Sequence, residues 1–228
     1  PQLGGTLRVV FAAEVSVPDP ETAWSFEDWM LARQVHAGLY RVVNGRPVPD
    51  LASGLPQKTA PGTYQITVHP EATFHDGRSV TSADVERMWT RVRPDGLSLR
   101  VTGAKTVQVS TAKGVSSVAV AKALGQPLSV ITGARPYIGA GPFVYRRADG
   151  KIRLEAYMTH HRGRPWLDEV VISHGVGSAR AIEEFIYKRA ELIFESAMNE
   201  RLAEVSAAAA RRFDGALLNK NGDGERSC

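Results

Sequence analysis

The segment from Gly62 to Val92 constrains the fold most, because it specifies a strand, a turn and a helix in immediate succession. Apolar and polar residues alternate over residues 63–69, which is the two-residue period of a half-buried strand. Asp76-Gly77 is a turn pair, since Gly accepts the positive φ that such a turn requires. Thr81 and Asp84 have the spacing of a capping box, and a helical apolar stripe follows at Val85, Met88, Trp89 and Val92. The segment therefore predicts a strand, a tight turn and a capped helix.

Strands and helices are predicted to alternate along the rest of the chain as well. Strands are expected at residues 7–13, 107–109, 169–173 and 191–194, and a hairpin at residues 143–157 around Asp149-Gly150, a favoured two-residue turn. Helices are expected at residues 117–124, around Ile182, Phe185 and Ile186, and at residues 202–212. A further helix is capped by Ser25 and Asp28, with Leu31, Val35 and Leu39 as its inner stripe. This alternation predicts an α/β fold with a mixed sheet.

Six short motifs follow one another in order over most of the chain. They are Gly4–Val9 with Asp19-Pro20, Gln34–Arg41 with Pro47–Ala52, Phe74–Gly77 with Thr81–Val85, Gly139–Phe143, His161–Val170 and Ser178–Ile193. Together they resemble the motifs of the family 5 extracellular solute-binding proteins, the peptide- and nickel-binding components of ABC importers. The fourth motif departs at one position, where Ala140 replaces the usual Thr. The resemblance implies a fold like that of type II periplasmic binding proteins.

The resemblance also predicts the domain organisation. Family members have two lobes that close on a ligand, whereas this sequence resembles them only to about the end of the first lobe, lobe I, and looks truncated there. We expect residues 1–45 and 140–217 to form the main subdomain of lobe I and residues 46–139 to form an inserted smaller subdomain. Residues 218–228 are polar and Gly-rich, and we expect them to form a disordered tail.

The ligand site is expected beyond the carboxyl end of the first strand, where open α/β sheets bind their ligands. The resemblance implies that this loop lines a cleft and pairs with an extended peptide through its backbone. The candidate ligand-binding residues are Glu14, Val15, Ser16, Trp29, His36, Tyr137 and Gly139. The spacing of Trp29, His36 and Tyr40 predicts that they share one helix face. The alternatives are a surface role for Glu14, an interior role for His36 and a tight backbone passage at Gly139.

Two classes of function remain open. The first is a non-catalytic binding protein for an oligopeptide-like solute in an ABC importer, with the permease as a partner or with self-association through the exposed cleft face. The second is a single-lobe homologue recruited as an enzyme or small-molecule carrier, with Glu14, His36 or His75 moving protons. The resemblance implies an extracytoplasmic location, and a cytoplasmic one if the full gene encodes no signal peptide.

Composition argues against several other classes of protein. The net charge of +4 is dispersed along the chain, which is unlike a nucleic-acid footprint. No run of 18 apolar residues exists, so no membrane-spanning helix is expected. Cys228 is the single cysteine, so the sequence offers no intrachain disulfide and no zinc site. His160 and His161 are expected to point to opposite faces of an extended segment and to lie near solvent, so no metal site is predicted there. The sequence also predicts no cofactor and no catalytic residue.

Overall fold

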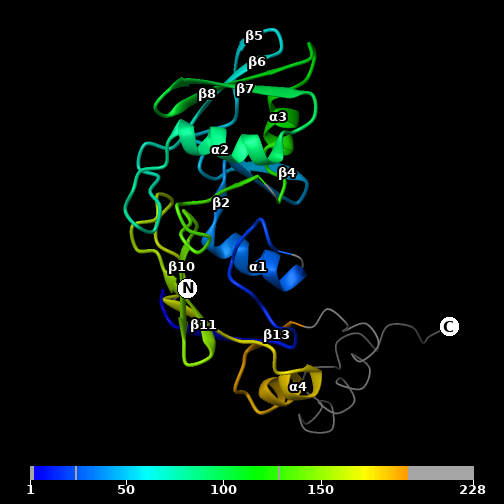
Figure 1. Cartoon of the computed structure of the whole chain (residues 1–228), viewed down its shortest axis with the longest axis vertical. Coiled ribbons are helices and arrows are strands. Elements are labelled where there is room, and N and C mark those ends of the chain that lie inside the picture. Colours follow the sequence, from blue (N-terminus) through cyan, green and yellow to red (C-terminus); the bar gives the residue numbers. More distant parts are fainter. Residues whose placement is uncertain (1–2, 24, 128, 195–228) are drawn as a thin grey trace, which may run out of the picture.

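The computed structural model describes residues 3–23, 25–127 and 129–194. Its largest sheet occupies the lower half of Figure 1 and has the strand order β10-β11-β12-β1-β13. The strands are β1 (Thr6–Phe11), β10 (Phe143–Ala148), β11 (Lys151–Ala156), β12 (Glu169–Ser173) and β13 (Leu192–Phe194). β1 runs parallel to both β12 and β13, whereas β11 is antiparallel to β10 and β12. The predicted α/β fold with a mixed sheet is therefore confirmed.

Two helices cover opposite faces of this sheet. Helix α1 (Phe26–Val35) packs on the face that carries Val9 and Phe11, through a cluster that includes Leu31. Helix α4 (Ser178–Ile186) packs on the other face, where Ala181 joins Val10 in a second cluster. Successive side chains of a strand point to opposite faces, so β1 is apolar on both. This burial from two sides explains the nearly continuous apolar run that predicted the first strand.

A four-stranded antiparallel sheet forms the upper part of the molecule in Figure 1, in the order β5-β6-β8-β7. Its strands are β5 (Gln57–Ala60), β6 (Thr63–Thr67), β7 (Leu97–Gly103) and β8 (Thr106–Thr111). Helices α2 (Ser82–Val92) and α3 (Ser117–Ala123) contribute to the core beside this sheet. Two small antiparallel pairs complete the described strands: β2 (Ala37–Gly38) with β9 (Val130–Ile131), and β3 (Tyr40–Val43) with β4 (Arg46–Pro49).

The predicted strand, turn and helix of residues 62–92 are confirmed. Tyr64 and Ile66 on β6 are buried, and Gly77 has a φ of 84° in the turn. The Thr81 N–H donates to the Asp84 carboxylate at 2.8 Å at the start of α2. Val85 and Met88 are buried on the inner face of α2, while Trp89 and Val92 are partly buried against the same core. The hairpin around Asp149-Gly150 is also confirmed, and both turn residues have positive φ.

Helix α1 ends earlier than the apolar pattern predicted. Val35 is its last residue, and His36 is extended, with φ −111° and ψ 147°. Leu39 and Tyr40 are buried, but they lie beyond the helix. The prediction that Leu39 continues the helical stripe is therefore wrong, and so is the prediction that Trp29, His36 and Tyr40 share a helix face. The cause is tertiary, because Ala37 pairs with the distant Ile131 in an antiparallel ribbon.

Three further differences concern the extent of the predicted elements. Strand β7 was not predicted, although Leu97, Leu99 and Val101 alternate with polar residues and pack against the core of α2. The strand predicted at residues 107–109 is longer, because it pairs with both β6 and β7. The helix predicted at residues 202–212 and the tail at 218–228 lie outside the described residues.

Candidate functional site

The loop after β1 begins at the sheet edge where three parallel strands end. β1, β12 and β13 run in one direction, so their carboxyl ends lie together. The Gly175 N–H donates to the Ala13 carbonyl at 2.8 Å, which joins the loops after β1 and β12. Glu14 Oε1 lies 3.2 Å from His174 Nδ1, while 70% of the Glu14 side chain remains exposed. His174 was missed in the sequence, although it directly follows a predicted strand at this edge.

The next two loop residues fasten the loop to the amino end of α1. The backbone N–H and the hydroxyl of Ser16 donate to Asp28 Oδ1 at 3.1 and 3.2 Å. Partial burial of Asp28 favours its neutral form, but the hydrogen bonds from Ser16 and Ser25 outweigh this and lower its pKa. Val15, one of the candidate ligand-binding residues, is only 1% exposed, so its side chain is not on the surface. Its side chain packs in the core between α1 and the sheet.

His36 is buried and joins the loop after β1 to a second segment. Its Nε2 lies 2.6 Å from the Pro18 carbonyl and 2.9 Å from the Pro136 carbonyl, so a single N–H can be shared between them. Nδ1 is buried and has no hydrogen-bond partner among the described residues. Burial lowers the pKa of His36 to about 4, although the two carbonyls oppose the shift. The geometry fits a neutral, structural histidine, which was the alternative to a ligand-facing one.

Gly139 and Gly141 form the tight backbone passage that the sequence suggested. The Gly141 N–H donates to the Val35 carbonyl at 2.9 Å, and a side chain at Gly139 would overlap that same carbonyl. His75 clamps the passage, since its Nδ1 accepts from the Gly139 N–H at 3.3 Å and its Nε2 donates to the Gly141 carbonyl at 3.0 Å. Burial lowers the pKa of His75, which fits a neutral ring with both nitrogens in use.

Hydrogen bonds connect the segments that carry several of the candidate ligand-binding residues, and these residues differ in exposure. Contacts of Ser16 and His36 tie the loop after β1 to α1 and to the segment around Pro136. Glu14, Ser16 and Tyr137 are exposed, and Trp29 is half-buried on α1. Val15, His36 and Gly139 are buried and support the surface from beneath.

His160 and His161 do not point to opposite faces as predicted. Their ring centroids are 4.4 Å apart, and the His161 ring lies 5.2 Å from that of His69. Residues 157–163 form hydrogen-bonded turns instead of an extended segment, which brings the two side chains together. Both rings are partly buried, and burial lowers the pKa of His160 to about 4. Within the described part of the chain, no group of three or more acidic, His or Cys side chains could hold a metal ion.

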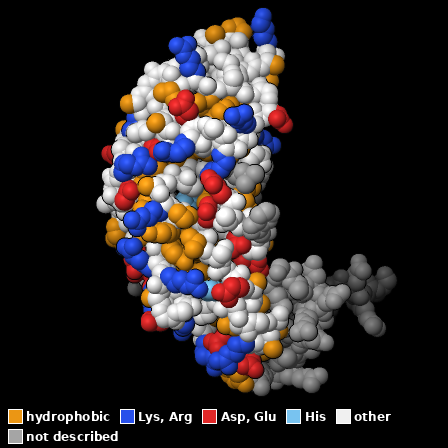
Figure 2. Space-filling view, in the orientation of Figure 1, with side chains coloured by type: hydrophobic (Ala, Val, Ile, Leu, Met, Phe, Trp, Pro, Cys, Tyr) orange, Lys and Arg blue, Asp and Glu red, His pale blue; other side chains and the backbone are white. Residues whose placement is uncertain are grey.

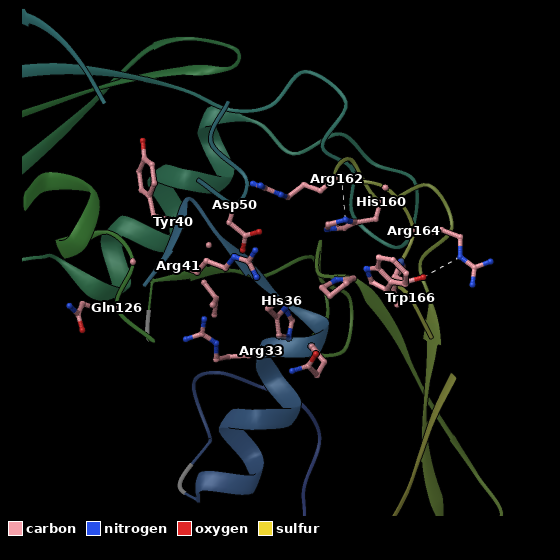
Figure 3. A pocket seen from close by; sticks show the side chains of 17 residues that line it. Arg33, His36, Tyr40, Arg41, Asp50, Gln126, His160, Arg162, Arg164 and Trp166 are labelled. Carbon is pink, nitrogen blue, oxygen red and sulfur yellow. Dashed lines mark hydrogen bonds between the residues drawn. The ribbon is translucent and has the colours of Figure 1, made fainter. Parts of the chain in front are cut away.

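A separate cavity of about 480 Å³ lies between the end of α1, strands β2 and β3, the turn after α3 and the loop at residues 160–166. We call it the arginine cavity, because its lining includes Arg33, Arg41, Arg162 and Arg164. Among its described lining residues Asp50 is the single carboxylate, and burial raises the pKa of Asp50 although Arg41 and Arg162 oppose this. Figure 3 shows Arg33, Arg41 and Arg162 around the cavity, with the Arg164 guanidinium pointing away.

The outer surface carries basic and apolar side chains together. On the face shown in Figure 2, hydrophobic side chains gather near the middle of the molecule and are bordered by Lys and Arg. None of the described helices is long and apolar enough to cross a membrane.

Comparison with solved structures shows a shared fold. The chain superimposes on the oligopeptide-binding protein AppA of Bacillus subtilis, solved with a nonapeptide, with 19% identity and a TM-score of 0.72, over 90% of this chain and 46% of that one. It superimposes on DppA of Helicobacter pylori, solved with the peptide STSA, with 17% identity and a TM-score of 0.70, over 89% of this chain and 49% of DppA. It superimposes on MoaA of A. tumefaciens R10, solved with mannopinic acid, with 18% identity and a TM-score of 0.73, over 91% of this chain and 48% of MoaA.

The chain thus corresponds to about half of each of these solved proteins, as expected for a single lobe of this fold. The comparison with curated proteins finds no match. Among protein families, residues 46–196 match the middle region of the bacterial extracellular solute-binding proteins of family 5. Because this match covers more than half of the sequence, the chain belongs to the family 5 bacterial extracellular solute-binding proteins.

Proposed function

We propose that this chain forms one wall of a binding site for a peptide or a similar solute, as part of an ABC importer's binding protein. The observation that carries the proposal is the loop after β1, which leaves the sheet at the carboxyl ends of three parallel strands and exposes Glu14 and Ser16. Residues 14–19 have no regular secondary structure, so those of their backbone groups that are not already hydrogen-bonded to His174, Asp28, His36 or one another can pair with an extended ligand. Two solved proteins of the same fold contain bound peptides, which supports this class of ligand.

Glu14 is the residue that we assign to the ligand's amino terminus. Its carboxylate lies 3.2 Å from His174 and stays mostly exposed, so an ammonium group can reach it. We assign apolar contacts with the ligand to Trp29 and Tyr137, which are at least partly exposed, whereas the buried Val15, His36 and Gly139 would act only as support. We propose no catalytic role, because the ring nitrogens of His36 and His75 that have partners are used in structural hydrogen bonds.

The domain division that we propose follows the sheets. Residues 1–45 and 140–217 would form the main subdomain, which is supported by a five-stranded sheet whose described strands span residues 6–11 and 143–194. Residues 46–139 would form the smaller subdomain, which is supported by the four-stranded sheet within residues 57–111. Family membership supports an extracytoplasmic location and a permease partner for the protein.

A wall that is exposed on one side should bind its ligand weakly or bury its surface against another copy. We expect a peptide dissociation constant from about millimolar to high micromolar, or self-association through the face that carries Glu14, Trp29 and Tyr137. Calorimetry with the peptide STSA, free and N-acetylated, tests the first outcome, and light scattering tests the second. Glu14→Gln should weaken binding of the free peptide and leave the acetylated one unchanged, whereas Glu71→Gln should affect neither. Nanomolar binding by a strict monomer, or neither binding nor association, would contradict the proposal.

A further inference from the structure

We propose that the arginine cavity is a second binding site, for a small organic anion that offers carboxylate or phosphate oxygens to Arg33 and Arg41. The inference does not rest on the proposed peptide site, because it uses other exposed side chains, although His36 lines the cavity and also contacts the Pro18 carbonyl of the loop after β1. Trp166 lines the cavity, and its backbone carbonyl accepts a hydrogen bond from the Gly4 N–H at 2.8 Å, just before β1 begins. The loop assigned to the peptide follows the other end of β1.

The cavity has an unbalanced positive charge. Arg164 is occupied, since it lies 2.6 Å from the Asp168 carboxylate and donates to the Pro165 carbonyl, and Arg162 donates to the Pro49 carbonyl. Arg33 and Arg41 form no hydrogen bond or ion pair within the described part of the chain, although the Asp50 carboxyl group is close enough to Arg41 to interact with it electrostatically. A guanidinium stays charged at any physiological pH, and its planar fork matches the two oxygens of a carboxylate or phosphate. The cavity therefore presents two guanidinium groups without hydrogen bonds to an incoming anion, and one of them, Arg41, also feels the nearby Asp50 carboxyl group.

The walls add features that select a small molecule over a bare ion. A volume of about 480 Å³ falls in the range of small-molecule sites. Trp166 is 60% exposed at the rim and offers a flat apolar surface, and the Gln126 amide can donate or accept a hydrogen bond. Figure 3 shows the Trp166 ring and the Arg41 guanidinium on different sides of the space. A ligand with an acidic end and a planar or apolar portion would contact both.

The floor of the cavity is held by backbone contacts, so the site exists before a ligand arrives. The Asp50 N–H donates to the Leu39 carbonyl at 2.9 Å, and Leu51 donates to the Gly38 carbonyl at 2.9 Å. A side chain at Gly38 would lie 2.8 Å from the Ser129 carbonyl, so the ribbon of β2 and β9 is closely packed here. Binding then requires ordering of the two arginine side chains but little movement of the backbone.

The test is calorimetry of the 228-residue chain with two probes, citrate and inorganic phosphate, at low ionic strength. Arg33→Gln and Arg41→Gln are compared with Arg100→Gln, which removes the same charge from the exposed surface of β7. We expect one molecule of at least one probe to bind per chain. Each cavity variant should weaken that binding by about tenfold or more, with less than about a twofold change in Arg100→Gln. The probe that binds more tightly distinguishes a carboxylate site from a phosphate site.

Two results would overturn the proposal. One is an equal loss of affinity in all three variants, which would show that the anions respond only to the net charge. The other is the absence of binding by either probe up to about 10 millimolar, a concentration at which even weak specific sites are occupied. Far-ultraviolet circular dichroism checks folding, and since Arg33 and Arg41 are exposed, their variants should fold normally. Arg41→Glu provides a second variant, and binding that survives this charge reversal would also refute the assignment.

Discussion

Acidification should destabilise this protein through His36, because the folded state holds the ring in its neutral form. His36 is 2% exposed, and burial lowers its pKa to about 4, against 6.5 for an unrestrained histidine. Between these two values the unfolded chain binds a proton that the folded chain does not bind. The contribution of His36 to stability is therefore complete at pH 8, begins to fall as the pH drops through 6.5, and keeps falling until about pH 4.

The size of the effect follows from the same two pKa values. A difference of one pKa unit corresponds to about 1.4 kcal/mol between protonation states. At pH 5 the unfolded ring is almost fully charged and the folded ring is mostly neutral, so His36 alone should cost about 2 kcal/mol relative to pH 8. The structural reason is Nδ1, which would carry the added proton while buried without an acceptor among the described residues.

Urea unfolding at pH 8 and pH 5 measures this cost, with His36→Gln as the comparison. The Gln amide nitrogen can reach towards the Pro18 and Pro136 carbonyls but does not titrate. The wild type should lose about 2 kcal/mol more than the variant between the two pH values, and all other titrations cancel in this difference. An equal loss in both proteins would show that His36 is charged, or solvated, in the folded state and would refute the reasoning.

Three further changes test the packing that supports the site. Gly139→Ala should destabilise the folded protein by about 3 kcal/mol or prevent folding, because the new methyl group overlaps the Val35 carbonyl. Gly54→Ala, where nothing lies nearby, should leave the thermal stability unchanged. Trp89→Ala should lower the free energy of unfolding, measured with a chemical denaturant, by about 2 kcal/mol. This is less than for a fully buried ring, because Trp89 is only partly buried. A loss below about 0.5 kcal/mol would show that the ring makes no stabilising contact. Asp84→Ala should cost about 2 kcal/mol, because it removes the cap of α2 together with the ion pair to Arg78, and unchanged helix stability by circular dichroism would disprove this.

Much of the local structure was determined by the sequence itself. The capping box at Thr81 and the stripe from Val85 onward depend on contacts within a few residues, so the start and inner face of α2 could be predicted. The same holds for the hairpin at Asp149-Gly150, where the turn pair sets the register of both strands. The family motifs likewise identified the fold before any tertiary contact was known.

Tertiary structure alone decided the features that join distant segments. Helix α1 stops at Val35 because the next residues pair with Val130 and Ile131, and no local pattern encodes that partner. Val15 and His36 are buried, since the loop after β1 folds onto α1 and the segment around Pro136. The arginine cavity unites side chains more than 100 positions apart in the sequence. Charges that far apart barely interact in the extended chain, so only the packing of the fold brings them together.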